Sequence, residues 1–373
     1  MEPTAGICSL GEQFLQNSLP VGVCDSNRTA STRSAVVRPA VVHAFSKYRS
    51  RLSSAIYISP PLWPDWFWAY CILYSMDLSI VIVPYKCKDK LRVTLDAVYA
   101  SVVNFEYEVI IVDNDSQDGS VEMVEQEYLS KSDIASRTTL IKNSNEGFAK
   151  GNNRGLKISK GQYKLLLNPD TKVAPETLQV MMDFMKSRPD VGIATCKLVK
   201  GDGTLDAACK RSLPDPWNAF MRVTGLSFLL PKSKLVAGYN LSHASPDDEM
   251  QIGACVGAFM FVSPECFKKI GLLDERFFMY GEDLDWCKSA SDAGFKVWYY
   301  PKTTTVHYKG SSSKKNSKKA LYEFHHTMWQ YYQKHLVKQY PFFLNWLVYV
   351  GIWLRYVLQL TKNAFRQEAY VSK

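Results

Sequence analysis

The fold of this chain is decided by the stretch DLSIVIVPYKCKDKLRVTLDAVYASVVNFEYEVIIVDNDSQDGS, residues 77–120. It opens with an apolar run at 78–83, continues with apolar residues at helical spacing between 91 and 102, and returns to an apolar run at 107–112. A strand, a helix and a second strand in this order are typical of a parallel sheet whose strands are joined by crossover helices. The sequence therefore predicts an α/β fold that begins at about residue 76.

The same alternation continues to about residue 300. The further elements expected are a helix from 121, strands at 138–141 and 163–167, a helix at 175–186, strands at 191–198 and 251–262, a helix at 282–293 and a final strand at 295–300. Residues 200–250 carry four prolines, among them Pro214, Pro216 and Pro231, and no clear period, so an irregular insertion is expected there. The predicted fold class is a mostly parallel α/β sheet flanked by helices, with a C-terminal helical tail.

Three parts of the chain differ in composition. Residues 1–75 mix Ser, Thr, Arg and Pro without a period, and Met76 directly precedes the first strand, so this part is predicted to be disordered or an extension that is not native. Residues 76–310 form the predicted catalytic domain. Residues 311–373 begin with a basic Ser/Lys loop and continue as amphipathic helices.

Composition excludes some classes of protein. With 373 residues, 46% of them hydrophobic, the chain can bury a large core and is not disordered throughout. A net charge of +9 suits a nucleic acid, an anionic membrane or a phosphate-bearing substrate. No nucleic acid is expected, because no basic stripe with interleaved aromatics is present. The nine cysteines show no close pairing or metal-ligand spacing and follow no secretory leader, which favours a reducing cytoplasm.

Polar residues that follow apolar strands are the first candidates for a site, because ligands of open α/β sheets lie beyond the carboxyl ends of the strands. Asp113 follows the second strand, where its carboxylate could accept the imide N–H of uracil or thymine. Asn168 and Asp170 follow the fourth strand, where a diphosphate could bind through a divalent ion. Asp283 could act as a base on a hydroxyl, whereas Glu282 beside it could be purely structural at a helix start.

Other candidates have a second interpretation of similar or greater weight. Glycines recur at every fourth position in residues 145–155, which permits close approach of a ligand but is explained equally well by helix packing. Lys150 in this segment could reach a nucleotide. Asp115 fits a turn or a helix cap better than a ligand contact. His307, expected after the last strand, could bind a metal or a diphosphate, or be a satisfied polar residue.

Taken together, these residues resemble glycosyltransferase family 2, the inverting enzymes with the GT-A nucleotide-diphospho-sugar transferase fold, and within it the rhamnosyltransferase-like members. The resemblance spans about residues 77–310. The motifs that carry it are Leu78–Val83, Val112–Asn114, Gly147–Gly155, Asn168–Thr171, Gly257–Met260 and Phe277–Asp283.

The resemblance implies transfer of a sugar, best guessed as L-rhamnose from dTDP-rhamnose, from a dTDP- or UDP-sugar donor. The implied acceptor is a hydroxyl of a saccharide or of a polyprenyl-diphosphate-linked saccharide in cell-surface polysaccharide synthesis. The implied cofactor is Mg²⁺ or Mn²⁺. The implied site comprises Asp283 as base with Glu282; Asp170 and His307 at the metal; and Tyr85, Asp113, Asp115, Gly147, Lys150, Asn152 and Asn168 at the nucleotide sugar.

The chain departs from the family pattern at two places. Pro84-Tyr85-Lys86 stands where the family usually has a small polar residue and then Tyr-Asn, which puts the nucleotide-side loop in doubt. Asn168 stands where some members have a second acid, which predicts a weaker dependence on metal. Two alternatives stay open: a transferase of galactofuranose or N-acetylglucosamine, and a nucleotide-sugar-binding protein that has lost catalysis.

Residues 341–360 are rich in Phe, Trp, Leu, Val and Tyr, but Asn345 and Arg355 interrupt them and basic residues flank both ends. This pattern favours a helix that lies in the membrane interface over a full span. A C-terminal helix docked on the protein is the alternative. The expected location is the cytoplasm, at the inner face of the cell membrane.

Overall fold

The computed structural model describes residues 76–223, 226–230, 238–308 and 317–364, together with Ser233 and Val236. The predicted extension at 1–75 and most of the basic loop lie outside the described residues.

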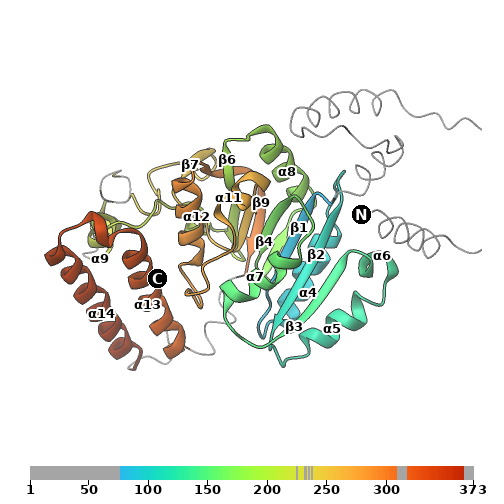
Figure 1. The fold of residues 1–373 in the computed structure, drawn as a ribbon, viewed down its shortest axis with the longest axis horizontal. Helices are drawn as coiled ribbons and strands as arrows, with labels where there is room; N and C mark the ends of the chain where they lie inside the picture. Colours follow the sequence, from blue (N-terminus) through green and yellow to red (C-terminus); the bar gives the residue numbers. More distant parts are fainter. Residues whose placement is uncertain are drawn as a thin grey trace, which may run out of the picture. The chain divides into compact units, whose positions relative to one another are not determined.

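The described residues form one nine-stranded sheet (Figure 1). Its order is β3-β2-β1-β4-β8-β6-β9-β5, and β7 pairs with β9 off this path. The strands are β1 Leu78–Ile82, β2 Tyr107–Asn114, β3 Thr138–Asn143, β4 Tyr163–Leu167, β5 Thr171–Val173, β6 Val191–Lys200, β7 Met250–Ile252, β8 Phe259–Val262 and β9 Lys296–His307.

The first half of the sheet is parallel, as predicted. β1 pairs in parallel with β2 on one side and with β4 on the other, and β2 pairs in parallel with β3. Every residue of β1 and β2 is buried, which explains why these strands are continuous apolar runs in the sequence. The carboxyl ends of β2, β1 and β4 therefore lie next to one another.

The second half mixes directions, so the sheet as a whole is mixed, although six of its nine strands run the same way. β8 is antiparallel to both β4 and β6, β5 and β7 are antiparallel to β9, and β6 is parallel to β9. Two predicted boundaries are wrong. The single strand expected at 251–262 is two strands, β7 and β8, separated at 253–258, and the last strand continues to His307 instead of ending at 300.

The helices cover the sheet and extend beyond it. α7 packs on β1 and β2, whereas α8 and α12 pack on β6 and β9. α11 is a helix that the sequence analysis did not predict. The helices are α4 Lys88–Tyr99, α5 Ser120–Glu127, α6 Ser132–Ala135, α7 Phe148–Ile158, α8 Thr177–Ser187, α9 Pro216–Val223, α10 Leu226–Leu229, α11 Pro264–Ile270, α12 Glu282–Asp292, α13 Ser317–His335 and α14 Phe342–Ala364.

The long helices α13 and α14 pack against each other as a hairpin (Figure 1). Rings of Trp329 and Tyr349 meet edge to face with centroids 5.0 Å apart across it. A second, smaller core of Phe277, Tyr331, Tyr332 and Leu336 joins α13 to the segment that precedes α12. The hairpin is thus packed onto the domain that carries the predicted acids.

Candidate active site

The glycine segment lies against the segment that precedes α12. Gly147 has a φ of +97°, and a Cβ added to it would be 2.4 Å from the carbonyl oxygen of Phe278. The backbone N–H of Phe148, the first residue of α7, donates to that same carbonyl at 2.7 Å. Glycine is therefore required at position 147 for both its φ and its size. The contact brings the start of α7 next to residues 277–281.

Asp113 is the next-to-last residue of β2 and is 4% exposed. Its Oδ2 accepts from the backbone N–H of Ser116 at 3.0 Å, which fixes the turn that follows. Its Oδ1 is buried and has no hydrogen-bond partner among the described atoms. The amide of the next residue, Asn114, donates to the carbonyl of Gly147 at 3.0 Å and so joins this strand end to the glycine segment.

Five buried side-chain atoms that have no partner among the described residues belong to the candidate site, four of them on predicted residues and one on Arg211, which the sequence did not indicate. Most buried polar groups in folded proteins are hydrogen-bonded, so each exception calls for an explanation such as a bound ligand. Of the thirteen such side-chain atoms among the described residues, five are Asp113 Oδ1, Asn152 Oδ1, Asn168 Oδ1, Arg211 Nε and Glu282 Oε2.

Asp170 and His307 are brought together by the pairing of β5 with β9, in which Thr171 lies opposite His307. His307 Nε2 is 3.4 Å from Asp170 Oδ1, and His307 Nδ1 is 2.9 Å from Asp206 Oδ2. Burial lowers the pKa of His307, but the hydrogen bonds with Asp170 and Asp206 outweigh it, so the net pKa is raised.

Asp170 and His307 could supply some of the ligands of one cation, but not a complete set. A carboxylate on one ring nitrogen is the usual device that orients a histidine ligand, and here Asp206 leaves Nε2 directed at Asp170. Among the described residues no group of three or more His, Cys, Asp or Glu side chains could hold a metal. A cation at Asp170 and His307 would therefore need further oxygen ligands from a bound diphosphate. Lys90 also lies here, with Nζ 3.8 Å from Asp170 Oδ2 and donating to the carbonyl of Tyr308.

The first turn of α12 carries three buried acids, Glu282, Asp283 and Asp285, which are 7%, 7% and 2% exposed. Asp283 Oδ2 accepts from Arg211 Nη2 at 2.7 Å and from the N–H of Gly257 at 3.3 Å. Glu282 has no ion pair among the described residues. Its burial, and then the charge of Asp283, raise the pKa of Glu282 to about 8.

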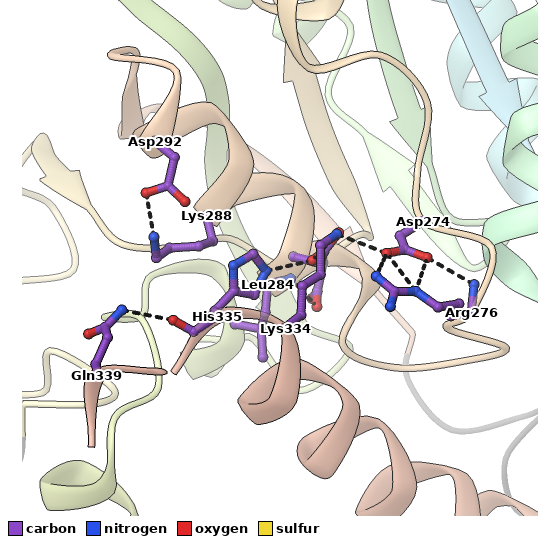
Figure 2. Close-up of polar contacts among 10 residues, drawn as sticks. Asp274, Arg276, Leu284, Lys288, Asp292, Lys334, His335 and Gln339 are labelled. Atoms are coloured by element: carbon purple, nitrogen blue, oxygen red, sulfur yellow. Dashed lines mark hydrogen bonds and ion pairs between the residues drawn. The ribbon is translucent and has the colours of Figure 1, made fainter. Parts of the chain in front are cut away.

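Asp285 is held by the C-terminal hairpin. Lys334 Nζ lies 2.7 Å from Asp285 Oδ1, and His335 Nε2 lies 2.7 Å from the same oxygen. Lys334 also reaches Asp274 Oδ2 at 2.8 Å, so this lysine joins two acidic segments (Figure 2). Arg276 pairs with Asp274 on its other side. The end of α13 is therefore ion-paired to the helix that carries the predicted base.

The segment that carries Asp170 and the predicted base Asp283 both contact the turn formed by Gly257 and Ala258. The N–H of Asn168, two residues before Asp170, donates to the carbonyl of Ala258 at 3.0 Å. The N–H of Gly257, the residue before Ala258, donates to Asp283. The diphosphate-side segment and the predicted base are thus attached to one turn of the chain.

The remaining predicted residues differ in how they lie. Asn152 is buried, and its Nδ2 donates to the carbonyl of Phe148 at 2.9 Å. Asp115 is exposed in the turn after β2 and accepts from Gln117 at 2.8 Å. Lys150 Nζ lies 3.9 Å from Glu146 Oε1 at the surface. Tyr85 is partly buried in the bend after β1. None of these contacts tests a role in binding, so the roles stay predictions.

Three residues of the site were missed in the sequence. Lys90 lies inside a helix, and Asp206 and Arg211 lie in the insertion at 200–250, where no strand end marks them. The backbone of Arg211 bridges Ala254 in antiparallel fashion, next to the turn that contacts the base. This non-local pairing brings Arg211 of the insertion to α12.

Comparison with known proteins gives a consistent result. Residues 79–241 match the family model described as Glycosyl transferase family 2. The chain is 27% identical over 235 residues to the low-salt glycan biosynthesis hexosyltransferase Agl10 of Haloferax volcanii, covering 62% of this chain and 67% of the relative. It is 24% identical over 217 residues to the N-acetylglucosaminyl-diphospho-decaprenol L-rhamnosyltransferase of Mycobacterium tuberculosis, covering 55% of this chain and 67% of the relative.

A mannosyltransferase from Pyrobaculum calidifontis, solved in complex with GDP-Man and Mn²⁺, is similar at 16% identity and a TM-score of 0.49, over 87% of this chain and 80% of that one. A TM-score below 0.5 leaves the fold assignment to the family model and to the sheet itself. The resemblance to family 2 and the GT-A fold class are confirmed on that basis.

Proposed function

We propose a reaction for this chain from one premise, that it is a glycosyltransferase with a family 2 domain. The proposed reaction is transfer of one sugar from a nucleoside diphosphate to an acceptor hydroxyl with inversion at the anomeric carbon. The observation that carries it is the turn at Gly257 and Ala258. This turn binds the predicted base, Asp283, through one residue and the diphosphate-side Asn168 through the next.

The proposed step is a single displacement. The acceptor oxygen attacks the anomeric carbon on the face opposite the diphosphate, and its proton passes to the carboxylate of Asp283. The bond between the anomeric carbon and the diphosphate oxygen breaks as the new bond forms, and its electron pair stays on the diphosphate. Asp283 is fixed for this task by two donors on Oδ2 and by the N–H of Leu284 on Oδ1 at 2.8 Å.

Asp170 and His307 would hold a Mg²⁺ or Mn²⁺ ion. Such an ion, when bound, neutralises negative charge on the departing diphosphate. Asp206 fixes the ring of His307 for that role, and Lys90 brings a second positive charge to the same place. Because Asn168 replaces one acid and Lys90 is close by, we expect metal to increase the rate without being strictly required.

The proposed donor is a pyrimidine nucleotide sugar, with dTDP-rhamnose as the best single candidate. The unpartnered Oδ1 of Asp113 supports a contact with the imide N–H of thymine or uracil. The mycobacterial relative is a rhamnosyltransferase by name, whereas the Haloferax relative is named only a hexosyltransferase. UDP-linked galactofuranose and N-acetylglucosamine therefore remain the alternatives.

The proposed acceptor is a lipid-linked saccharide at a membrane surface. α14 has 23 residues, its most apolar 18-residue stretch has a mean hydropathy of 1.3, and 6% of that stretch is buried. Its two polar interruptions lie toward the protein, since Asn345 accepts from Tyr332 at 2.7 Å and Arg355 lies 5.8 Å from the ring of Phe324. The exposed apolar residues of α14 are Phe342, Phe343, Trp346, Leu347, Tyr349, Val350, Leu354, Val357 and Leu358.

This distribution supports binding of α14 in the interface at the inner face of the cell membrane. One apolar face is exposed, and Asn345 and Arg355 are used within the hairpin. An acceptor saccharide carried on polyprenyl diphosphate would be presented at that same surface.

The test is turnover with a panel of dTDP and UDP sugars, with and without Mg²⁺ or Mn²⁺, measured as release of nucleoside diphosphate. Release should require an acceptor, should be fastest with one donor, and should fall at least about a thousandfold in Asp283→Asn. Asp292→Asn, at the exposed end of the same helix, is the matched control and should keep wild-type turnover. Tight nucleotide binding without any release would show a binding protein and overturn the proposal.

A further inference from the structure

We propose that Arg211 is the positioning residue that makes Asp283, and not its neighbour Glu282, the ionised carboxylate of this site. The proposal deepens the proposed function and rests on it. Arg211 comes from the irregular insertion at 200–250, so it also assigns that insertion a part in the reaction.

The cations near α12 are distributed unequally over its three acids. Asp285 has Lys334 and a contact with His335, and Asp283 has Arg211. Glu282 forms no ion pair among the described residues, although it is as buried as Asp283; burial and then the charge of Asp283 raise its pKa by more than the charge of Arg211 lowers it. A buried carboxylate keeps its charge only where a cation or several donors stabilise it. The distribution therefore gives Asp283 a charge and leaves Glu282 with its proton.

Hydrogen bonds fix both the backbone and the side chain of Arg211. Its backbone N–H donates to the carbonyl of Ala254 at 3.0 Å, and its carbonyl accepts from Gly253 and Ala254 at 2.9 Å. Its Nη2 donates to the carbonyl of Cys255 and to Asp283, both at 2.7 Å. A guanidinium held in this way sets the direction of the Asp283 carboxylate as well as its charge.

Other titratable groups around Asp283 act in the same sense or are neutral. Burial and the charge of Asp283 raise the pKa of Glu282 to about 8. A hydrogen bond with Cys287, and then burial, raise the pKa of Cys255, so this thiol is uncharged. Tyr239 interacts with Arg211 from the insertion. Arg211 is thus the cation that the described residues supply to Asp283 itself.

The arrangement separates two tasks between adjacent acids. Asp283 can accept the proton of the attacking hydroxyl at neutral pH, whereas neutral Glu282 can donate a hydrogen bond through its unpartnered Oε2. Two carboxyl groups whose surroundings push their protonation apart are a recurrent arrangement in enzymes that need both forms.

The test compares the pH dependence of kcat/KM for wild type, Arg211→Met and Arg211→Lys, with the best donor from the panel. In Arg211→Met the acidic limb should move up by about one to three pH units and kcat should fall, with donor KM nearly unchanged, because the base loses its cation. In Arg211→Lys the acidic limb should stay near the wild-type position while kcat still falls, because lysine keeps the positive charge but lacks the planar guanidinium that orients the carboxylate. Arg188→Met removes a surface pair with Asp190 and is the matched control.

An unchanged acidic limb in Arg211→Met, or an equal movement in both variants, would overturn the proposal. Binding of UDP or dTDP and the unfolding temperature show whether each variant is folded. Should Arg211→Met not fold, Arg211→Lys decides alone: reduced kcat with an unmoved limb supports the proposal, and full wild-type kcat refutes it. Absence of turnover in the wild type would instead count against the proposed function.

Discussion

Replacing Glu282 by glutamine should stabilise the folded protein increasingly as the pH rises from about 5 to about 8. Glu282 is 7% exposed, and its pKa is raised from the ordinary 4.5 to about 8 by burial and then by the charge of Asp283. The folded protein keeps this proton over a range in which the unfolded chain has lost it. Glutamine has nearly the same shape and cannot ionise, so the variant removes this difference in proton binding.

The sign and size of the effect follow from linkage. The stability that the neutral carboxyl contributes is fully present below about pH 4.5 and is lost as the pH rises through about 8. Within that window the unfolded chain holds one proton fewer than the folded one. The free energy of unfolding of the wild type should therefore fall by about 1.4 kcal/mol per pH unit relative to the variant. The difference between 4.5 and 8 sets a ceiling of about 5 kcal/mol at pH 8.

Urea unfolding of the full chain, followed by tryptophan fluorescence at pH 5, 6, 7 and 8, measures this difference. Glu265→Gln, at an exposed position in the first turn of α11, is the control and should show no such slope. Stabilities of wild type and Glu282→Gln that run parallel across this pH range would refute the reasoning, because Glu282 would then be ionised in the folded state.

Three further perturbations test other parts of the structure. Gly147→Ala should lower the free energy of unfolding, measured with urea, by more than about 2 kcal/mol, because both the positive φ and the close contact oppose a Cβ. Gly203→Ala, where φ is positive but the space is open, should lower it by only about 1 kcal/mol, and equal losses in the two variants would contradict this explanation. Lys334→Met should lower the free energy of unfolding by about 2 kcal/mol by removing the lysine cation from buried Asp285, and a loss under about 0.5 kcal/mol would count against the ion pair. Leu347→Glu should weaken co-sedimentation with anionic vesicles about tenfold or more, and undiminished binding would show that α14 does not enter the interface.

Most of the parallel half of the sheet could be predicted because β1, β2 and β4 are buried apolar runs between clear helical periods. The edge strand β3 is partly exposed, and its signal was the short β-branched run that starts at Thr138. The predicted bounds of these four strands differ from the observed ones by at most two residues. β7 and β8 were merged because the residues between them, Ala254 to Ala258, are as apolar as a strand. The chain turns there because Gly253 lies against the backbone of Ser212 and Leu213, a contact distant in sequence.

β9 was ended too early because proline usually terminates a strand. Here the register shifts between Cys196 and Lys197, where β6 passes from Tyr300 to Thr304 of β9, and the shift accommodates Pro301. α11 had a signal that was not used, since Pro264 stands in its first turn after Ser263.

The candidate site was predictable where function follows strand ends. Asp113, Asn168 and Asp170 follow apolar runs, and Glu282 and Asp283 begin a helix, so sequence position alone identified them. Arg211 and Asp206 could not be found in this way. They reach the site through pairing of the insertion with residues 253–254 and with His307, and no local pattern specifies such pairings.

The ion pairs between α13 and Asp285 change where this protein can be divided. The composition changes near residue 310, which makes this the natural place to cut in order to obtain an enzyme without the apolar helix α14. A cut there would strip Asp285 of Lys334 and His335 and leave an unbalanced charge two residues from Asp283. A shortened enzyme or a chimera should therefore keep α13, which contacts Asp285, and be divided between α13 and α14. Only the apolar helix α14 is then removed or replaced.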